Sequence, residues 1–169
     1  MEDMEIPDDK VARIQTAWRR ERPDLDVAPQ GVIGRLHRLA AHLTAELETV
    51  YSRHGLSEGE FDVLATLRRA GAPFELAPSE LADQTMVTTG GMTKRLDRLE
   101  ARGLLRRRAA GGDGRRRVVA LTPEGVELID AAFTDHLQNE RRLIDHLGAS
   151  DSRALEELLA RWLAHYEGE

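Results

Sequence analysis

The sequence predicts a mainly α-helical protein with one small β-hairpin. Over most of its 169 residues, apolar residues recur every three or four positions, which is the spacing of amphipathic helices. Around residues 104–121 the pattern shortens to that of two strands flanking a glycine-rich turn. With 41% hydrophobic residues, the chain can bury one ordinary core. We therefore expect one main domain with a short extension, and not two independent domains.

The N-terminal part predicts two helices of different length. Apolar residues at helical spacing precede Pro23, so residues 1–30 are expected to be an extension that contains one short helix. A longer amphipathic pattern follows over residues 31–54 and ends at Gly55, a residue type common after helices. A helix of this length with one apolar face needs a large partner surface.

The next segment predicts two short helices joined by a tight turn. Ser57 and Glu60 have the spacing of a capping box at the start of a helix that precedes these two. Pro78 suits the first turn of the first short helix. The chain must turn after Thr85, and Thr88 is expected to cap a further helix. That helix directs Met92, Leu96 and Leu99 inward.

Two strands and further helices complete the pattern. Residues 104–109 and 116–121 flank Gly-Gly-Asp-Gly, whose residues tolerate the positive φ of a hairpin turn. Helix-turn-helix and hairpin together predict a winged helix-turn-helix over about residues 56–122. The helices at 31–54 and 123–167 are expected to form a dimerisation domain, because their apolar faces exceed what a domain of about eighty residues could cover. Residues 31–169 then form one domain of a homodimer.

Charge is distributed unevenly along the chain. Residues 87–122 carry ten Lys or Arg against three acids, a net charge of +7, whereas the other 133 residues carry −13 for a total of −6. A basic island in an acidic protein is typical of a small module that contacts nucleic acid. A solvated charged face is the alternative.

Several classes of protein are excluded or disfavoured. The chain has no cysteine, which excludes disulfides, thiolate zinc sites and cysteine nucleophiles. No apolar run approaches the about 18 residues of a membrane helix, and the N-terminus lacks the order of a signal peptide. We expect a cytoplasmic protein without membrane association.

Catalytic and metal-binding motifs are also missing from the sequence. The six histidines show no HExxH spacing, and there is neither a GxSxG motif nor a P-loop lysine. We therefore expect no enzyme, no metal and no cofactor. An interaction module with the same fold remains an alternative to a nucleic-acid-binding protein, and a steep salt dependence of DNA binding would distinguish the two.

The residues from Pro78 to Gly125 resemble the winged helix-turn-helix segment of the MarR family of transcriptional regulators. The most specific part is Asp113-Gly114-Arg115 followed by a strand that ends in Leu121-Thr122, similar to the wing pattern of the family. The family often has Arg where this chain has Gly114, so one wing contact is moved to Arg116 or missing. The resemblance implies a repressor that a small ligand releases from DNA.

The resemblance and the helix-turn-helix geometry together predict the DNA contacts. The N-terminal residues of the second helix lie in the major groove, and a wing tip can enter the minor groove. A dimer places two such helices about one helical turn apart, which predicts a double-stranded, palindromic operator. The predicted DNA-binding residues are Thr88, Thr89, Gly90, Thr93, Lys94, Arg115 and Arg116.

A narrower resemblance concerns the urate-responsive subgroup of the family. The segment around Trp18 is similar to the extra N-terminal helix of that subgroup, whose ligand site implies Trp18, Asp62, Arg95 and Arg107 here. Arg107 is one of three consecutive arginines on a predicted strand, so either neighbour is an alternative. The resemblance implies that urate or a related anionic purine is the effector, and a phenolic carboxylate or other aromatic anion is the rival ligand.

Each ligand residue also has a purely structural interpretation. Trp18 can serve as an aromatic anchor that packs the N-terminal helix. Asp62 lies next to apolar residues, where a carboxylate needs a partner such as Arg95, so the pair can be a structural salt bridge. If the ligand interpretation holds, an anion near Asp62 moves Arg95 and the recognition helix, and thereby favours the state that does not bind DNA.

Overall fold

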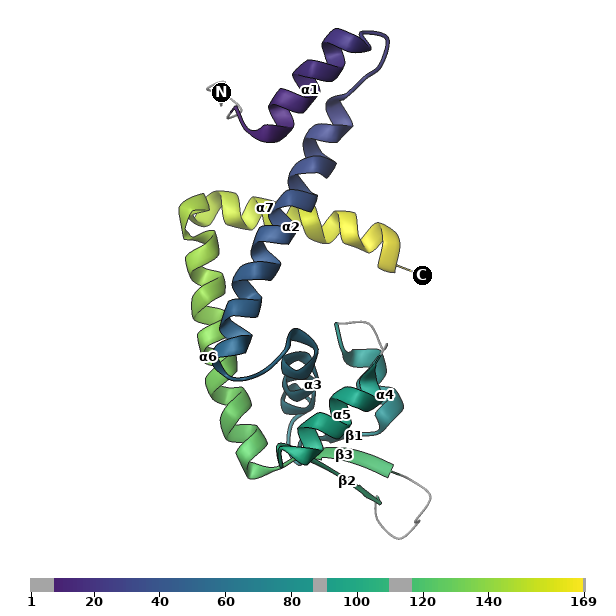
Figure 1. Ribbon diagram of the computed structural model, residues 1–169, viewed down its shortest axis with the longest axis vertical. Helices are drawn as coiled ribbons and strands as arrows, with labels where there is room; N and C mark the ends of the chain where they lie inside the picture. The colour runs from purple at the N-terminus through teal and green to yellow at the C-terminus, as the bar shows by residue number, and fades with distance from the viewer. Residues whose placement is uncertain (1–7, 87–90, 110–116, 169) are drawn as a thin grey trace. The chain divides into compact units, whose positions relative to one another are not determined.

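The computed structural model describes residues 8–86, 91–109 and 117–168 (Figure 1). The chain divides into two compact units. One unit comprises residues 1–46 and the other residues 47–169. Helix α2, Ala28–Arg53, crosses the boundary between them.

The first unit holds the predicted short helix, α1, Lys10–Glu21, against the N-terminal half of α2. Asp9 caps α1 by accepting a hydrogen bond from Ala12 N (2.8 Å), and it also accepts one from Arg35 Nε on α2 (2.8 Å). Gln15 Nε2 donates to the carbonyl of Val27 (2.8 Å). These contacts make α1 and the start of α2 a helical hairpin.

Helix α2 begins at Ala28, three residues before the start expected from the apolar pattern. Asp26 accepts a hydrogen bond from Ala28 N (2.9 Å) and so binds an otherwise unpaired amide of the first turn. Gly34 allows α1 to approach, because a Cβ atom built there would lie 3.2 Å from Val11 Cγ1.

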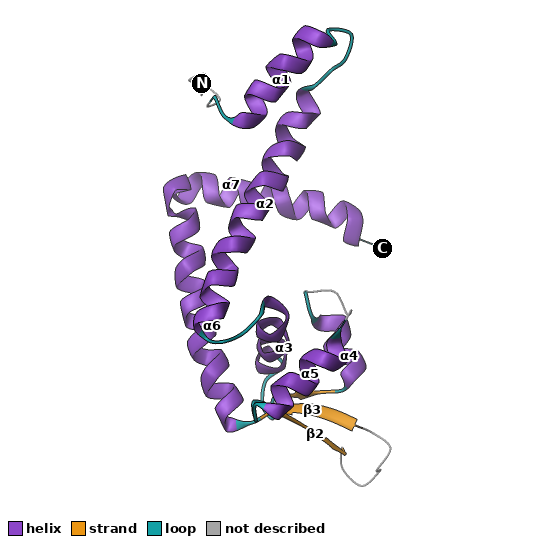
Figure 2. Ribbon diagram, viewed as in Figure 1, coloured by secondary structure: helices purple, strands orange, loops and turns teal. Residues whose placement is uncertain are grey.

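The second unit contains three helices over a three-stranded sheet, followed by two long helices (Figure 2). After the end of α2, its elements are α3 Glu58–Arg69, β1 Glu75–Leu76, α4 Pro78–Gln84, α5 Met92–Ala101, β2 Leu105–Ala109, β3 Arg117–Leu121, α6 Pro123–Ile144, the 3₁₀ helix Asp145–Leu147 and α7 Gly148–Glu167. This is the predicted fold class, mainly helical with a small antiparallel sheet.

The sheet has the order β1-β3-β2, and all its pairs are antiparallel. Leu105 pairs with Leu121 and Arg107 with Val119, which confirms the predicted hairpin strands. The turn between them lies outside the described residues. β1 was not predicted, because two residues are too short to show a strand pattern.

Leucines of α3 and α5 form the centre of the core. Leu64, Leu67 and Leu99 are fully buried, Leu96 is nearly so, and the partly buried Met92 packs against them. The three inward residues predicted for the second short helix are therefore confirmed. That helix starts later than the expected cap at Thr88, because Gly91 adopts a positive φ (82°) and forms the N-cap itself.

An aromatic cluster links the end of α2 to α3 and α6. The ring centroids of Tyr51 and Phe61 lie 4.3 Å apart, and that of His136 on α6 lies 5.0 Å from Phe61. Burial, together with the charge of nearby carboxylates, raises the pKa of Tyr51 to about 12. The winged helix-turn-helix over residues 56–122, which we call the reading head, thus packs onto α6.

Helices α6 and α7 confirm the prediction that the C-terminal part of the chain is helical. Many of their apolar side chains are exposed. Leu158, Leu163 and Tyr166 of α7 are each more than half exposed. Among the described residues, no helix combines the length and the apolar character needed to cross a membrane.

Candidate nucleic-acid interface

Helix α5 is the second helix of the helix-turn-helix, and its two sides have opposite character. Leu96 and Leu99 are buried against the core, whereas Thr93 and Lys94 in its first turn are exposed. The hydroxyl and ammonium groups of an exposed first turn can donate to phosphates or bases. Two of the seven predicted DNA-binding residues therefore lie on a solvent-facing helix start.

The other five predicted DNA-binding residues fall outside the part of the chain that the structure describes. They are Thr88, Thr89 and Gly90 before α5, and Arg115 and Arg116 between β2 and β3. Their roles stay predictions.

Arg98 of α5 and Arg102, the C-cap of this helix, bind partners outside α5. Arg98 Nε donates to Glu60 Oε1 of α3 (3.0 Å), and Arg102 Nη1 donates to the carbonyl of Gly55 (2.9 Å). The bond to Glu60 forms because α5 packs next to the start of α3. Arg98 thus anchors the recognition helix to α3, and Arg102 anchors its end to the segment between α2 and α3.

Glu60 is a buried carboxylate with two tasks. It accepts hydrogen bonds from the backbone N–H and hydroxyl of Ser57 (both 3.0 Å), which confirms the predicted capping box, and it pairs with Arg98. Burial raises the pKa of Glu60, but the bonds from Ser57 and the charge of Arg98 outweigh it, so the net pKa lies below 4.5. The cap of α3 and the position of α5 depend on one side chain.

Arg107 of β2 is held by two acids of α5. Its guanidinium lies 2.7 Å from Asp97 Oδ1 and 2.8 Å from Glu100 Oε2, and its backbone N–H donates to Glu100 Oε1 (2.8 Å). A helix turns by about 100° per residue, so these two acids lie on nearly the opposite side of α5 from Arg95. Arg107 therefore joins the hairpin to the recognition helix.

The neighbouring arginines of β2 face away from this contact. Arg106 is exposed and Arg108 pairs with Glu75 of β1. This is the alternation expected of a strand, and it makes Arg107 the one of the three that reaches α5.

Asp62 and Arg95 lie on the facing sides of α3 and α5. Asp62 is only 7% exposed, and Arg69 Nη1 lies 3.9 Å from its Oδ1. The side chain of Arg95 crosses α3 at Gly59, one turn before Asp62. The structure thus places these two predicted ligand residues on adjacent parts of one helix contact, and Arg107 on another side of α5.

Trp18, the fourth predicted ligand residue, belongs to the first unit. It lies in the last part of α1, and 48% of its surface is exposed. The indole is therefore available for a contact beyond the hairpin of α1 and α2.

Sequence reasoning missed the acids that position α5. The sequence pattern assigned no role to Asp97 and Glu100, and it assigned Glu60 only to a helix cap. Two acids on this helix precede three consecutive arginines on the following strand. This charge pattern was the signal that could have predicted the Arg107 contact.

The chain resembles known transcriptional regulators in sequence. The MarR family profile matches residues 54–116. The HTH-type transcriptional regulator PecS of Dickeya dadantii is 42% identical over 156 residues, which span 92% of this chain and 94% of PecS. The HTH-type transcriptional regulator MhqR of Bacillus subtilis is 29% identical over 109 residues, which span 64% of this chain and 73% of MhqR.

Solved structures show the same fold. AbsC, a MarR family transcriptional regulator from Streptomyces coelicolor, has a TM-score of 0.72 at 25% identity and covers 86% of this chain and 99% of its own. A mutant MarR from E. coli, complexed with operator DNA, has a TM-score of 0.67 at 26% identity, with 86% and 97% coverage. This chain belongs to the MarR family of winged helix-turn-helix transcriptional regulators.

Proposed function

We propose that this regulator binds a palindromic double-stranded DNA operator as a homodimer, represses transcription there, and is released by a small anion. The observation that carries the proposal is the first turn of α5, where Thr93 and Lys94 are exposed on a helix whose other side is buried. The second helix of a helix-turn-helix enters the major groove with its N-terminal residues. The E. coli relative in complex with operator DNA supports the same use of this fold.

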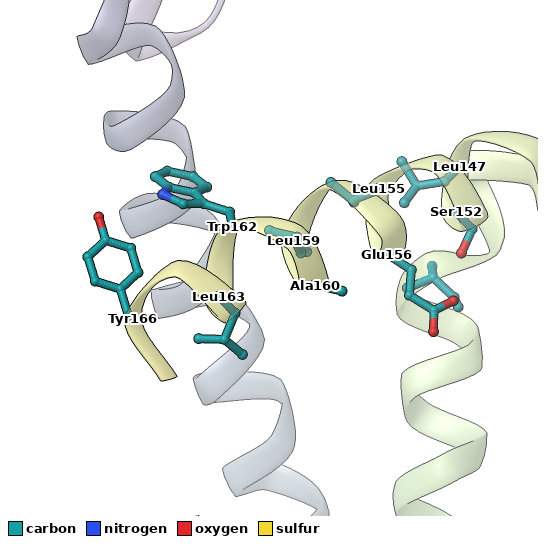
Figure 3. A pocket seen from close by; sticks show the side chains of 10 residues that line it. Leu147, Ser152, Leu155, Glu156, Leu159, Ala160, Trp162, Leu163 and Tyr166 are labelled. Atoms are coloured by element: carbon teal, nitrogen blue, oxygen red, sulfur yellow. The ribbon is translucent and has the colours of Figure 1, made fainter. Parts of the chain in front are cut away.

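The surface of α7 supports a homodimer. An apolar groove of about 680 Å³ runs along α7 and the end of α6, and Figure 3 shows Leu155, Leu159 and Trp162 among the side chains that line it. Exposed apolar patches of this kind mark interaction sites. A second copy of the chain would cover the groove symmetrically and repeat the reading head, as a palindromic operator requires.

The two lysines of the chain allow a matched test of DNA binding. Lys94 lies on α5 and Lys10 on α1, and both are exposed. The measurement is the fluorescence anisotropy of labelled DNA from upstream of the protein's own gene, over a series of salt concentrations. If Lys94 contacts a phosphate, Lys94→Ala weakens binding and lowers the salt slope by about one, whereas Lys10→Ala leaves both unchanged.

The absence of DNA binding at low salt would contradict the operator proposal. It would favour the alternative in which the winged domain serves as a protein-interaction module. DNA binding that does not depend on the palindromic symmetry of the site would contradict only the proposal that the protein binds as a homodimer.

The proposed effector is urate or a related anionic purine, with Trp18, Asp62, Arg95 and Arg107 as its site residues. The resemblance to the urate-responsive subgroup supports this assignment, as does the meeting of Arg95 with α3 beside the buried Asp62. An anion that draws Arg95 toward itself would shift α5, which carries Thr93 and Lys94. The rival effector is a phenolic carboxylate or another aromatic anion.

Titration of the protein–DNA complex with urate and with salicylate distinguishes the effectors. Release by urate alone, lost in Arg95→Ala, is the expected result. Release by salicylate alone would overturn the purine assignment and leave operator binding intact. An Arg95→Ala variant that responds like the wild type would remove Arg95 from the site.

A further inference from the structure

Arg69, in the last turn of α3, joins two groups that belong to different helices. One of its amino groups, Nη2, donates a hydrogen bond to the backbone carbonyl of Gln84, the last residue of α4. The other, Nη1, lies 3.9 Å from Oδ1 of Asp62 on α3 itself. One guanidinium thus links a carboxylate of α3 to the end of the first helix of the helix-turn-helix.

The end of α4 is capped by side chains, not by a glycine. Thr85 forms the C-cap, with its N–H donating to Leu81 O (3.2 Å) and its hydroxyl to Ala82 O (3.0 Å). Arg69 supplies a donor for Gln84 O from another helix. A cation at a helix C-terminus also interacts favourably with the partial negative charge of the last carbonyls.

Asp62 is placed to hold Arg69 in this position. The two residues are seven positions apart on α3, which puts them two turns apart on the same face. Asp62 is 7% exposed, and a buried carboxylate is stable only near a positive charge or hydrogen-bond donors. The carboxylate therefore favours the side-chain orientation in which Arg69 reaches across to α4.

We propose that Arg69 is a positioning residue for DNA reading. It fixes the end of α4, from which the chain leaves toward Gly91 and the start of α5, and Asp62 holds Arg69 in place. The inference rests on the proposed operator binding. Because the Arg69 side chain is 47% exposed, its ion pair contributes little to global stability, so the effect lies in the geometry of the reading head.

Arg68 is the matched control for Arg69. It is the preceding residue, and its side chain is 40% exposed. It pairs with Asp130 of α6 (Nε to Oδ1, 2.8 Å) and lies over the ring of Phe74 at 4.7 Å. Its removal subtracts the same charge from the same turn of α3 without touching α4.

The first experiment needs no DNA. Hydrogen exchange measured by mass spectrometry is compared for the segment 78–86 in the wild type, Arg69→Ala and Arg68→Ala proteins. Protection of this segment falls in Arg69→Ala and is unchanged in Arg68→Ala. Equal protection in all three proteins would overturn the inference, whether or not the protein binds an operator.

The second experiment measures operator affinity over a series of salt concentrations. Arg69→Ala weakens binding about 10-fold, equivalent to about 1.4 kcal/mol, with the salt slope of the wild type. Arg69→Lys binds more tightly than Arg69→Ala, because an ammonium can still donate to Gln84 O. A slope reduced by about one would show a direct phosphate contact instead and overturn the positioning role.

A double-mutant cycle tests the part played by Asp62. If Asp62 acts through Arg69, Asp62→Asn weakens operator binding, and the double variant is no weaker than Arg69→Ala alone. Additive losses would contradict the link between the two residues. If the wild type binds no operator, the proposed function fails, and the exchange experiment still decides whether Arg69 holds the end of α4.

Discussion

Arg95 passes so close to Gly59 that a Cβ atom built on this glycine would lie 2.3 Å from Arg95 Nε. Gly59 occupies the first turn of α3, where alanine would be the better helix former by up to about 1 kcal/mol. The glycine leaves room for a guanidinium stem between α3 and α5. Its position therefore controls where Arg95 can lie.

Gly59→Ala is expected to displace Arg95 without removing a charge. The displacement should impair the response to urate as Arg95→Ala does, while the melting temperature stays within a few degrees of the wild type, since the gain in helix propensity offsets the crowding. The measurement is release of labelled operator DNA by urate, with Glu58→Ala in the same turn as the control. A full urate response in Gly59→Ala would contradict a role for the position of Arg95.

Arg107→Ala is expected to leave Asp97 and Glu100 as two uncompensated negative charges on the recognition helix. Repulsion of these acids from DNA phosphates and loss of the link to β2 should weaken operator binding about 10-fold, or about 1.4 kcal/mol. Arg106→Ala, which removes the same charge from an exposed neighbour, is the control. Binding measured by anisotropy should recover in part when Glu100→Gln is added to Arg107→Ala.

The same variant tests the predicted ligand role of Arg107. If Arg107 serves only to hold β2 on α5, the urate concentration that releases half of the bound operator DNA is the same for Arg107→Ala and the wild type. The two proteins are compared at equal initial occupancy of the DNA. A loss of the urate response in Arg107→Ala and not in Arg106→Ala would support a place for Arg107 in the ligand site.

Glu60 should give the protein an acid-sensitive component of stability. Its pKa in the folded state lies below the ordinary value of 4.5, so the stabilisation is present above that pH and is lost as the pH falls through the lower folded value. Glu60→Gln is expected to lower stability by about 1 kcal/mol near neutral pH, because a neutral amide loses the ion pair with Arg98 and accepts weaker hydrogen bonds than a carboxylate does.

Thermal unfolding over a series of pH values checks this prediction. The difference between wild type and Glu60→Gln should shrink as the pH falls below 4.5, because protonation then removes the charge from the wild-type side chain too. A difference that is constant across the whole range would show that the charge of Glu60 contributes nothing.

A charge in the groove of α7 should separate the proposed dimer. Leu159 lines the groove, whereas Ala154 lies on another face of the same helix. Leu159→Glu is expected to give a monomer in analytical ultracentrifugation and to lose tight operator binding, because a buried unpaired carboxylate is costly. Ala154→Glu should sediment as the wild type does, and a dimeric Leu159→Glu protein would place the interface elsewhere.

The sequence by itself determined the elements and their inward faces. The periodicity of apolar residues predicted the long helices and the burial of Leu96 and Leu99, because burial of an apolar stripe is imposed locally by the helical repeat. The capping box of Ser57 and Glu60 was readable for the same reason, since both partners lie within one turn. Hairpin strands were predicted from their flanking turn residues.

The tertiary structure decided which polar groups meet. The bonds of Arg98 to Glu60, of Arg107 to Asp97 and Glu100, and of Arg69 to the end of α4 join different elements. Long charged side chains can reach many partners at similar energy, so no local pattern selects among them. Only the packing of α3, α5 and the hairpin brings one partner within reach, and it is this packing that positions the recognition helix.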